Sequence, residues 1–292
     1  GAICIREISR FLGRSPNTIS REVCKNSVKG TYCANKANHK SYFKRWRSKR
    51  QCLKVATDSL LHRFVDEKLR KKWSPEQISG HLLREFGISC STKAIYKFAR
   101  RRCYDRYLFW GWNKHQGGRK QYQYDTPKDG RKYIDERPLL DGAGHLEMDF
   151  IVSRQSTWVL LVLVDRWTKN TWVRRLPNRK HSTIRAALSG TLSGIEVKSI
   201  TTDNDIAFTC WKDLEVLLNT RIYFTHSYHS WEKGLVENTN RWIRCFVPKK
   251  RDIASVSEED LESIHAFLND RPRAVIGFAI PSRYYQSIAC PN

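Results

Sequence analysis

Three carboxylates in the second half of the chain could act together on a phosphodiester. Asp149 lies within an apolar, strand-like run, Asp203 directly follows another such run, and Glu237 lies early in a helical segment. Converging carboxylates repel each other unless a cation lies between them, and hard oxygen ligands favour Mg²⁺ or Mn²⁺. Two such ions, about 4 Å apart, can clamp the attacking and leaving oxygens of an in-line phosphoryl displacement. We therefore expect these three residues to be catalytic and to bind two Mg²⁺ (or Mn²⁺) ions.

Each carboxylate taken alone has a simpler explanation. An Asp after a strand is usually a turn former, and a Glu on a helix usually faces solvent. Asp149 is harder to dismiss, because an unpaired charge inside an apolar strand is costly. The combination, rather than any single residue, favours a metal-dependent site.

The segments around these carboxylates alternate between strand and helix. The sequence predicts strands at 145–153, 157–165, 171–176, 197–202 and 221–225, and helices at 180–194, 211–218, 234–247 and 257–270. Three consecutive strands followed by alternating helix and strand indicate an α/β domain with a mixed five-stranded sheet and helices on its faces. With the usual central pairing, Asp149 and Asp203 lie on neighbouring strands, and a helix brings Glu237 to them.

The chain is strongly basic, and its charge is uneven. There are 53 Lys plus Arg against 29 Asp plus Glu, a net charge of +24. Residues 1–141 carry a net charge of +20, whereas residues 142–292 carry +4. A field of this sign and size is typical of a protein that binds a polyanion, so we expect double-stranded DNA as the partner of the first half. A solvated basic surface, as in a ribosomal protein, is the alternative.

The first 25 residues have the pattern of a helix-turn-helix. Ile5, Ile8 and Leu12 share a helical face, Gly13 ends that helix, and Ser15 followed by Pro begins the next one. The second helix of this motif enters the major groove, where Asn and Arg can read base edges. A short helical hairpin without DNA contacts is the alternative. The residues expected to contact DNA are Arg14, Ser15, Asn17, Thr18 and Arg21.

A second helical pair is predicted at 73–102. Trp73, Ser74 and Pro75 open a helix that carries Ile78, Leu82, Leu83 and Phe86 and ends at Gly87, and Ser91 or Thr92 caps the next helix. Lys93 and Lys97 are expected on its DNA-facing side. The basic run at 44–50 between the two pairs is expected to contact phosphates. We therefore predict modules at 1–57 and 58–102, a basic linker at 103–141 and a catalytic domain at 142–292.

The cysteines and the apolar runs indicate a reduced cytoplasmic setting. There are nine Cys with no C-x-x-C pair, and no secretory signal is visible. The longest apolar run, 158–164, is too short for a membrane helix, so no membrane partner is expected. Cys24, Cys33 and His39 could be imagined as zinc ligands, but their spacing fits no common site.

Local motifs resemble those of bacterial insertion-sequence transposases of the IS-thirty family. The segments are GHLEMDF around Asp149, TTDN around Asp203, YHSWEKGLVENTNRWIRCFVPK around Glu237 and LNDRPRAVIGFAIPSRYY near the end. IREISRFLGRSPNTISREV and WSPEQISGHLLREF resemble the family's two DNA-binding modules. The likeness covers nearly the whole chain, and the 33 residues between Asp203 and Glu237 also fit.

The resemblance implies a DDE-type transposase with an RNase H-like, integrase-type catalytic core. Asp149, Asp203 and Glu237 align with its triad, and Arg241 and Arg244 follow Glu237 where related enzymes place DNA-contacting residues. His145 and Glu147 share a face with Asp149, so a supporting role or simple packing is expected of them. The implied activity is cleavage at terminal inverted repeats and strand transfer to target DNA, by a homo-oligomer that pairs two ends at the bacterial nucleoid.

Several positions depart from the family pattern. Leu146 and Met148 replace a common Trp and Gly, and 205–208 replace the usual residues after the second Asp. The chain also begins at Gly1 inside the first module, which predicts a truncated N-terminus. A catalytically impaired remnant that only binds DNA is therefore the alternative function. A metal-dependent nuclease, such as a ribonuclease H or a resolvase, is a third possibility that two helix-turn-helix modules disfavour.

Overall fold

A computed structural model describes the chain except for residues 1–3, 28–29, 52–53, 109–129, 227–228 and 290–292. The chain divides into two compact units. The first unit comprises residues 1–66 with 90–103, and the second comprises 67–89 with 104–292. Each unit is described by itself below, and the module boundaries expected from the sequence remain predictions.

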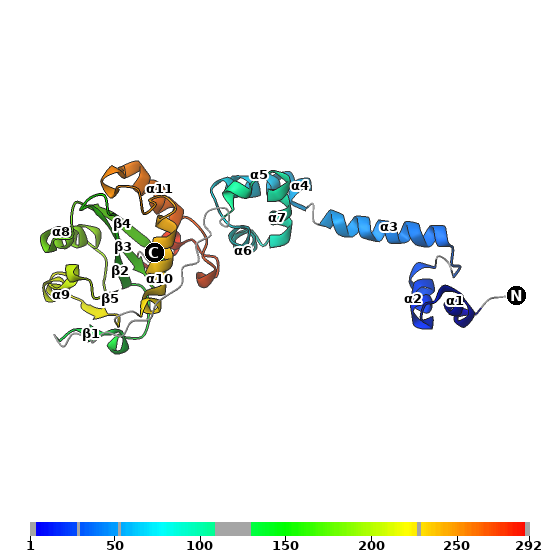
Figure 1. Cartoon of the computed structure of the whole chain (residues 1–292), viewed down its shortest axis with the longest axis horizontal. Helices are drawn as coiled ribbons and strands as arrows, with labels where there is room; N and C mark the ends of the chain where they lie inside the picture. Colours follow the sequence, from blue (N-terminus) through cyan, green and yellow to red (C-terminus); the bar gives the residue numbers. More distant parts are fainter. Residues whose placement is uncertain (1–3, 28–29, 52–53, 109–129, 227–228, 290–292) are drawn as a thin grey trace. The chain divides into compact units, whose positions relative to one another are not determined.

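The first unit begins with the helical pair that the sequence predicts (Figure 1). Helix α1 (Ile5–Leu12) ends at Gly13, whose φ of 59° is left-handed backbone that suits glycine. Helix α2 (Pro16–Asn26) begins with Pro at its first position, and the Ser15 side chain accepts a hydrogen bond from the Thr18 amide. The predicted start and stop signals of this pair are therefore confirmed.

The rest of the first unit is also helical. The basic run at 44–50 belongs to α3 (Ala34–Gln51), which is followed by α4 (Lys54–Thr57). Helix α7 (Thr92–Arg101) is capped by Ser91, the first of the two predicted candidates, and packs against α4. Helix α5 (Ser59–Arg70) runs across the boundary at residue 66.

In the second unit, helix α6 (Pro75–Phe86) packs against the C-terminal part of the chain. Gly80 lies so close to the ring of Phe278 that an added Cβ would come within 2.3 Å of it. The Gln77 side chain donates to the Pro272 carbonyl at 2.9 Å. The expected apolar face of α6 is partly wrong, because Leu83 and Phe86 are 60% and 56% exposed.

The second unit contains a six-stranded sheet with the order β1-β6-β5-β2-β3-β4. The strands β2, β3 and β4 pair antiparallel, and β5, β6 and β1 continue the sheet in parallel pairings. All five predicted strands are present: β2 (His145–Val152), β3 (Val159–Asp165), β4 (Thr171–Leu176), β5 (Ser199–Thr202) and β6 (Arg221–Phe224). The sixth, β1 (Lys132–Tyr133), lies in the segment predicted to be a linker. This is an RNase H-like arrangement, as predicted, with one short edge strand added.

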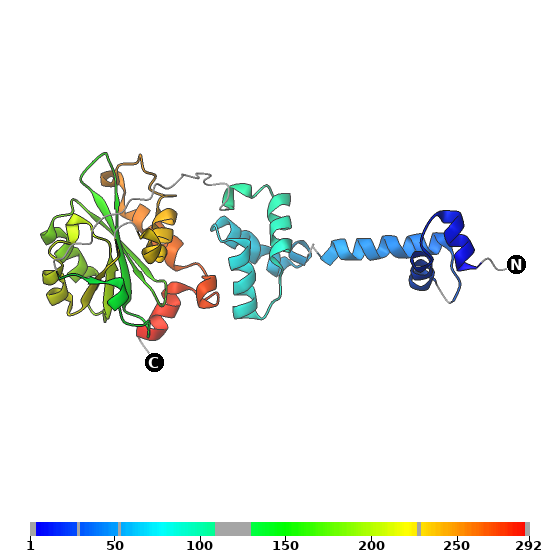
Figure 2. The ribbon, with the colours of Figure 1, turned by 60° about the horizontal axis from the view of Figure 1, so that its bottom comes forward.

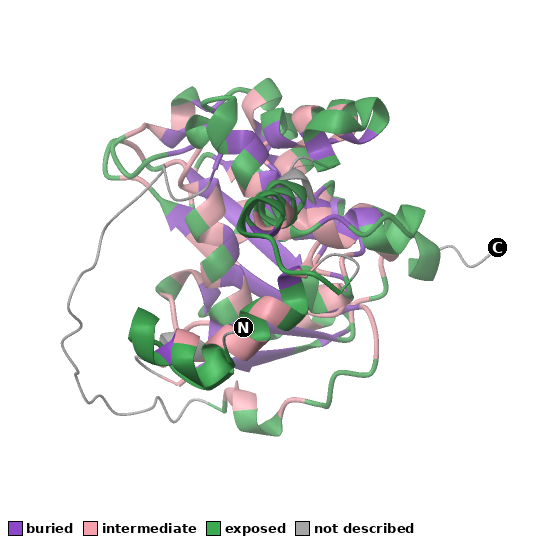
Figure 3. Cartoon of the chain, turned by 90° about the vertical axis from the view of Figure 1, so that its right-hand side faces the viewer, coloured by how far each residue is buried: buried purple, intermediate pink, exposed green. Residues whose placement is uncertain are grey.

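Helices cover both faces of the sheet (Figures 2 and 3). Helices α8 (His181–Thr191) and α9 (Trp211–Leu218) pack on one face, in a core that includes Leu146, Met148 and Leu161. Helices α10 (Gly234–Ile243) and α11 (Glu258–Asn269) pack on the other, around Ile151 and Val162. Side chains alternate along a strand, so the odd-numbered residues of β2 face α10.

Short 3₁₀ turns and one further helix are also found among the described residues of this unit. The turns are η1 (Asp105–Tyr107), η3 (Ile134–Glu136), η4 (Ile206–Phe208), η5 (Ser230–Lys233), η6 (Ile253–Ser255) and η7 (Ala274–Ile276), and the helix is α12 (Pro281–Ala289). Among the described residues, no helix is long and apolar enough to cross a membrane.

Candidate active site

The sheet register brings Asp149 and Asp203 together. Strands β2 and β5 are parallel neighbours, with His145 opposite Ser199 and Glu147 opposite Thr201. Strand β5 ends at Thr202, and the same register continued by two residues sets Asp149 opposite Asp203. The predicted pairing of these two strands is therefore confirmed, with Asp149 on β2 and Asp203 just past the end of β5.

The side chain of Lys233 joins these two carboxylates. Its ammonium lies 3.3 Å from Oδ1 of Asp149 and 3.1 Å from Oδ2 of Asp203. The Lys233 side chain is only 6% exposed, while those of Asp149 and Asp203 are 19% and 42% exposed. Burial raises the pKa of the Asp149 carboxyl, the nearby Lys233 charge lowers it, and Asp203 raises it. The site is thus a half-buried pair of acids that shares one cation.

Helix α10 carries Glu237 past this pair. Lys233 directly precedes the helix, and Asn240 lies on its second turn, where its amide donates to Oδ2 of Asp149 at 2.7 Å. Residues three and four apart share a helical face, so Glu237 lies on the face bounded by these two contacts. Glu237 is half-buried and occupies the first turn of α10.

Glu147 fixes the start of α10 against the sheet. It is 5% exposed, and its Oε2 accepts a hydrogen bond from the Val236 amide at 2.9 Å. That amide belongs to the first turn of the helix, where backbone donors have no partner within the helix. Burial raises the pKa of Glu147, and the Val236 amide and then Arg166 lower it. Glu147 therefore sets the position of the helix that bears Glu237.

His145, by contrast, is part of the packing at the start of β2. Its Nδ1 lies 2.7 Å from Oγ of Ser199, and its Nε2 lies 2.8 Å from a carboxylate oxygen of Asp141. Both ring nitrogens thus have partners near the start of β2, and neither partner is Asp149.

We predict that replacing Glu147 destabilises the second unit. Glu147→Ala removes a buried acceptor and leaves the Val236 amide without its partner, which costs about 2–4 kcal/mol. Glu147→Gln keeps an acceptor oxygen of the same shape and should cost about 1 kcal/mol. Urea unfolding of the three proteins measures the difference, and equal losses for the two variants would argue against the capping role.

The loop after Asp203 is held by several contacts. Asn204 accepts a hydrogen bond from Arg131 at 3.0 Å and donates to the Thr225 carbonyl at 2.8 Å. Asp205 forms an ion pair with Arg179 at 2.7 Å, and the buried Phe208 stacks on Phe150. Asp205 and Phe208 thus anchor the turn at 205–208, whereas Ile206 is 84% exposed.

The two other departures lie in the core. Leu146 and Met148 are 1% and 0% exposed and face α8 and α9, on the face of β2 opposite to that of Asp149. Neither replacement touches the carboxylate pair.

The basic residues after Glu237 differ in their surroundings. Arg241 is exposed, as a DNA contact would require. Arg244 is half-buried, donates to the Val152 carbonyl at 2.8 Å and has its pKa lowered by burial. The structure thus ties Arg244 to the end of β2, and its predicted contact with DNA stays a prediction.

The residues predicted to contact DNA in the helical pairs lie at the surface. Arg14, Asn17, Thr18 and Arg21 are exposed, and Ser15 is exposed while capping α2. Lys93 and Lys97 are exposed on α7. Their accessibility fits a DNA contact, which remains a prediction.

Sequence reasoning missed Lys233 and Asn240. Lys233 directly precedes α10 and Asn240 lies within it, four residues before and three residues after Glu237, so helical spacing makes both of them candidates. Which of the polar residues in this segment contact Asp149 depends on how α10 meets β2, and this only the structure shows.

A helix-turn-helix with exposed polar residues, combined with an acidic site on an RNase H-like sheet, is typical of proteins that cleave or join DNA. Residues 3–26 match a family model described as a helix-turn-helix domain. The transposase of insertion element IS4351 from Bacteroides fragilis is 28% identical, over 98% of this chain and 91% of its own length. Transposase InsI of insertion element IS30C from Escherichia coli (strain K12) is 32% identical, over 95% of this chain and 77% of its own length. The catalytic core domain of BIV integrase is 17% identical with a TM-score of 0.40, covering 50% of this chain and 96% of that one.

The chain belongs to the insertion-sequence transposase family that includes InsI of IS30. It is a DNA transposase by family, as the motifs predicted.

Proposed function

We propose that the protein is a DDE-type transposase whose catalytic residues are Asp149, Asp203 and Glu237. The observation that supports this proposal is the shared cation: Asp149 on β2 and Asp203 just after β5 both lie beside the buried ammonium of Lys233. Helical spacing puts Glu237 on the same face of α10 as Asn240, which contacts Asp149. A nearby positive charge favours the ionised form of two neighbouring carboxylates, and Lys233 supplies it here.

The residues of the site fit Mg²⁺ or Mn²⁺. The donors are carboxylate oxygens, which these hard cations prefer, and two of the carboxylates lie close enough to share one cationic group, the Lys233 ammonium. Oδ1 of Asn240 is buried beside the site and has no hydrogen-bond partner among the described residues. Two bound ions would neutralise phosphate charge and activate the attacking hydroxyl or water.

Neighbouring groups of the protein position Asp149 and the segment after Asp203. Asn240 and the Phe150 amide donate to Asp149 and hold its carboxylate in one orientation. Arg131 and the Thr225 carbonyl hold Asn204, the residue that follows Asp203. No side chain acts as a covalent nucleophile in this proposal, because the 3′-hydroxyl of the element end attacks the target phosphodiester directly.

The helical units are proposed to bind the terminal inverted repeats. Two ends must be paired before transfer, so a homo-oligomer on DNA is proposed, acting at the nucleoid of a bacterial cytoplasm. The test uses the full-length protein, Mg²⁺ and a DNA fragment carrying one end of the encoding element. Cleavage at the end and joining to a plasmid support an active transposase, whereas specific binding without turnover supports the DNA-binding remnant.

Arg21 gives a test of sequence readout by α2. If its guanidinium reads a base edge, Arg21→Ala should weaken binding to the element end by about 10-fold or more. Binding to random DNA should change much less, because that depends on phosphate contacts. Gel-shift titrations over a range of salt concentrations measure both affinities. Arg10→Ala on α1 is the matched control, since Arg10 is also exposed, and an equal loss in both variants would argue against readout by Arg21.

A further inference from the structure

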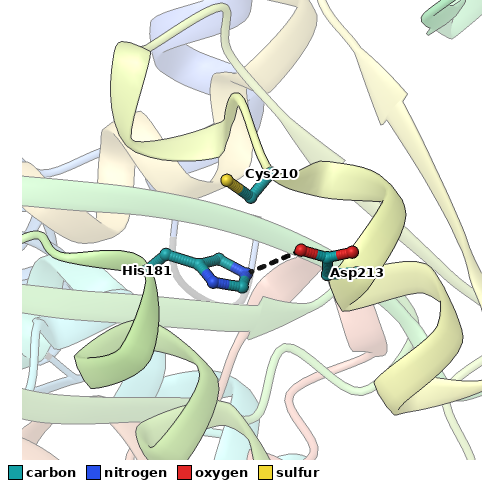
Figure 4. A group of neighbouring side chains, drawn as sticks. All are labelled: His181, Cys210 and Asp213. Carbon is teal, nitrogen blue, oxygen red and sulfur yellow. Dashed lines mark ion pairs between the residues drawn. The ribbon is translucent and has the colours of Figure 1, made fainter.

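Three side chains of types that bind metal ions, none of them part of the carboxylate pair, lie close together (Figure 4). His181 begins α8, Cys210 directly precedes α9, and Asp213 lies in the first turn of α9. Their ligand atoms all lie within 4.8 Å of one another. Because α8 and α9 pack side by side on one face of the sheet, residues about thirty apart in the sequence meet here.

One ring nitrogen of His181 lacks a polar partner among the described residues. Its Nε2 is buried and has no hydrogen-bond partner among the described residues. The nearest acid is Asp213, whose Oδ2 is 3.9 Å away, which is too far for a hydrogen bond. A buried polar atom without a partner costs free energy, and a metal ion would satisfy it.

The spacing of the donors suits a tetrahedral ion. Zinc binds histidine nitrogen and carboxylate oxygen at about 2.0–2.2 Å and cysteine sulfur at about 2.3 Å. Ligands around such a centre lie roughly 3.3–3.7 Å from each other, so 3.9 Å between Nε2 and Oδ2 is close to a bound geometry. Cys210 and Asp213 are exposed, and their side chains can therefore rotate inward.

We propose that His181, Cys210 and Asp213 form a site for Zn²⁺ or a similar borderline transition metal. A nitrogen, a thiolate and a carboxylate are a ligand set that favours zinc over magnesium. The fourth position is left to water or to a ligand from outside the described residues. This site differs in chemistry from the all-oxygen site at Asp149, and its existence does not depend on that site's function.

A neighbouring group of donors fits a metal less well. His226, His229 and Glu232 also lie within 4.8 Å of one another. However, Nδ1 of His226 is 3.0 Å from Glu232, and its Nε2 is 3.2 Å from Asp135. Both nitrogens already have carboxylate partners, whereas Nε2 of His181 has none within hydrogen-bonding distance.

The proposed metal would link the start of α8 to the start of α9. The ion pair between Arg179 and Asp205 already links the segment before α8 to the turn before α9. A metal bound by His181 and Cys210 would add a second link beside it. Both links would restrain the turn that follows Asp203, so zinc should stiffen the loop that bears this carboxylate.

Cobalt substitution tests the site in the full-length protein. Co²⁺ bound to a thiolate gives a near-ultraviolet charge-transfer band, which carboxylates alone cannot produce. We expect one equivalent of Co²⁺ to give this band, zinc to abolish it, and Cys210→Ser to lose it. Cys24→Ser is the matched control, because Cys24 is another exposed thiol, and it should keep the band.

Two further variants separate ligation from folding. His181→Ala and Asp213→Asn should weaken Co²⁺ binding, while thermal unfolding without metal stays near that of the wild type. Zinc should raise the unfolding temperature of the wild type but not that of Cys210→Ser. A wild-type protein without the band, or a Cys210→Ser protein that retains it, would overturn the proposal.

Discussion

Asp149→Asn, Asp203→Asn and Glu237→Gln should each lower the rate of cleavage at an element end by about 10³-fold or more. Metal ligation contributes several kcal/mol of transition-state stabilisation, and each loss of about 1.4 kcal/mol slows the reaction tenfold. Asp149 should show the largest effect, because it lies between Lys233 and Asn240 and is the most enclosed member of the pair. Single-turnover cleavage with Mg²⁺ measures the rates.

Two controls show whether a lower cleavage rate comes from the chemical step rather than from weaker DNA binding. Glu262→Gln changes an exposed acid on α11 and should leave the rate unchanged. Gel shifts with the element end should give the same affinity for wild type and triad variants, because the helix-turn-helix is untouched. A triad variant that cleaves at the wild-type rate would refute the assignment of that residue.

Asn240→Ala should reduce the rate by about 10- to 100-fold. The amide of Asn240 donates to Oδ2 of Asp149 at 2.7 Å and fixes the carboxylate that is proposed to bind metal. Residues that orient metal ligands have effects of this size on metal affinity or activity. Part of the loss should be recovered at high Mg²⁺ concentration, which a purely structural defect would not show.

The same helix offers a matched control for this variant. Asn238 is exposed on α10, two residues from Asn240, and Asn238→Ala removes the same kind of side chain. Its rate in Mg²⁺ should stay within a factor of about two of the wild type, as is usual for surface substitutions. Equal losses in the two variants would mean that the amide of Asn240 has no special role.

Much of this arrangement could be predicted because it depends on local signals. Gly13 and Ser15 mark a helix end and a helix start by backbone chemistry that does not require tertiary contacts. Asp149 stands out because a charge inside an apolar strand needs a reason. The order of strands and helices from 145 onward then led to the correct pairing of β2 with β5.

The remaining features depend on contacts between distant segments. The two-residue strand β1 has no pattern of its own and is defined only by its pairing with β6. Leu83 was predicted on the same side of the helix as Ile78 and Leu82, but its side chain is 60% exposed. The cluster of His181, Cys210 and Asp213 arises from the packing of α8 on α9, which no local pattern encodes.

Exchanging a metal ligand tests the central claim most directly. The measurement is a time course of cleavage and joining at an element end with wild-type protein and Asp149→Cys, in Mg²⁺, in Mn²⁺ and in EDTA. A thiolate binds Mg²⁺ poorly and accepts the softer Mn²⁺ more readily. We predict that the wild type is active in both metals and inactive in EDTA, and that Asp149→Cys is active only in Mn²⁺. Wild-type activity in EDTA, or an Asp149→Cys protein that works equally well in Mg²⁺, would contradict a metal site at these carboxylates.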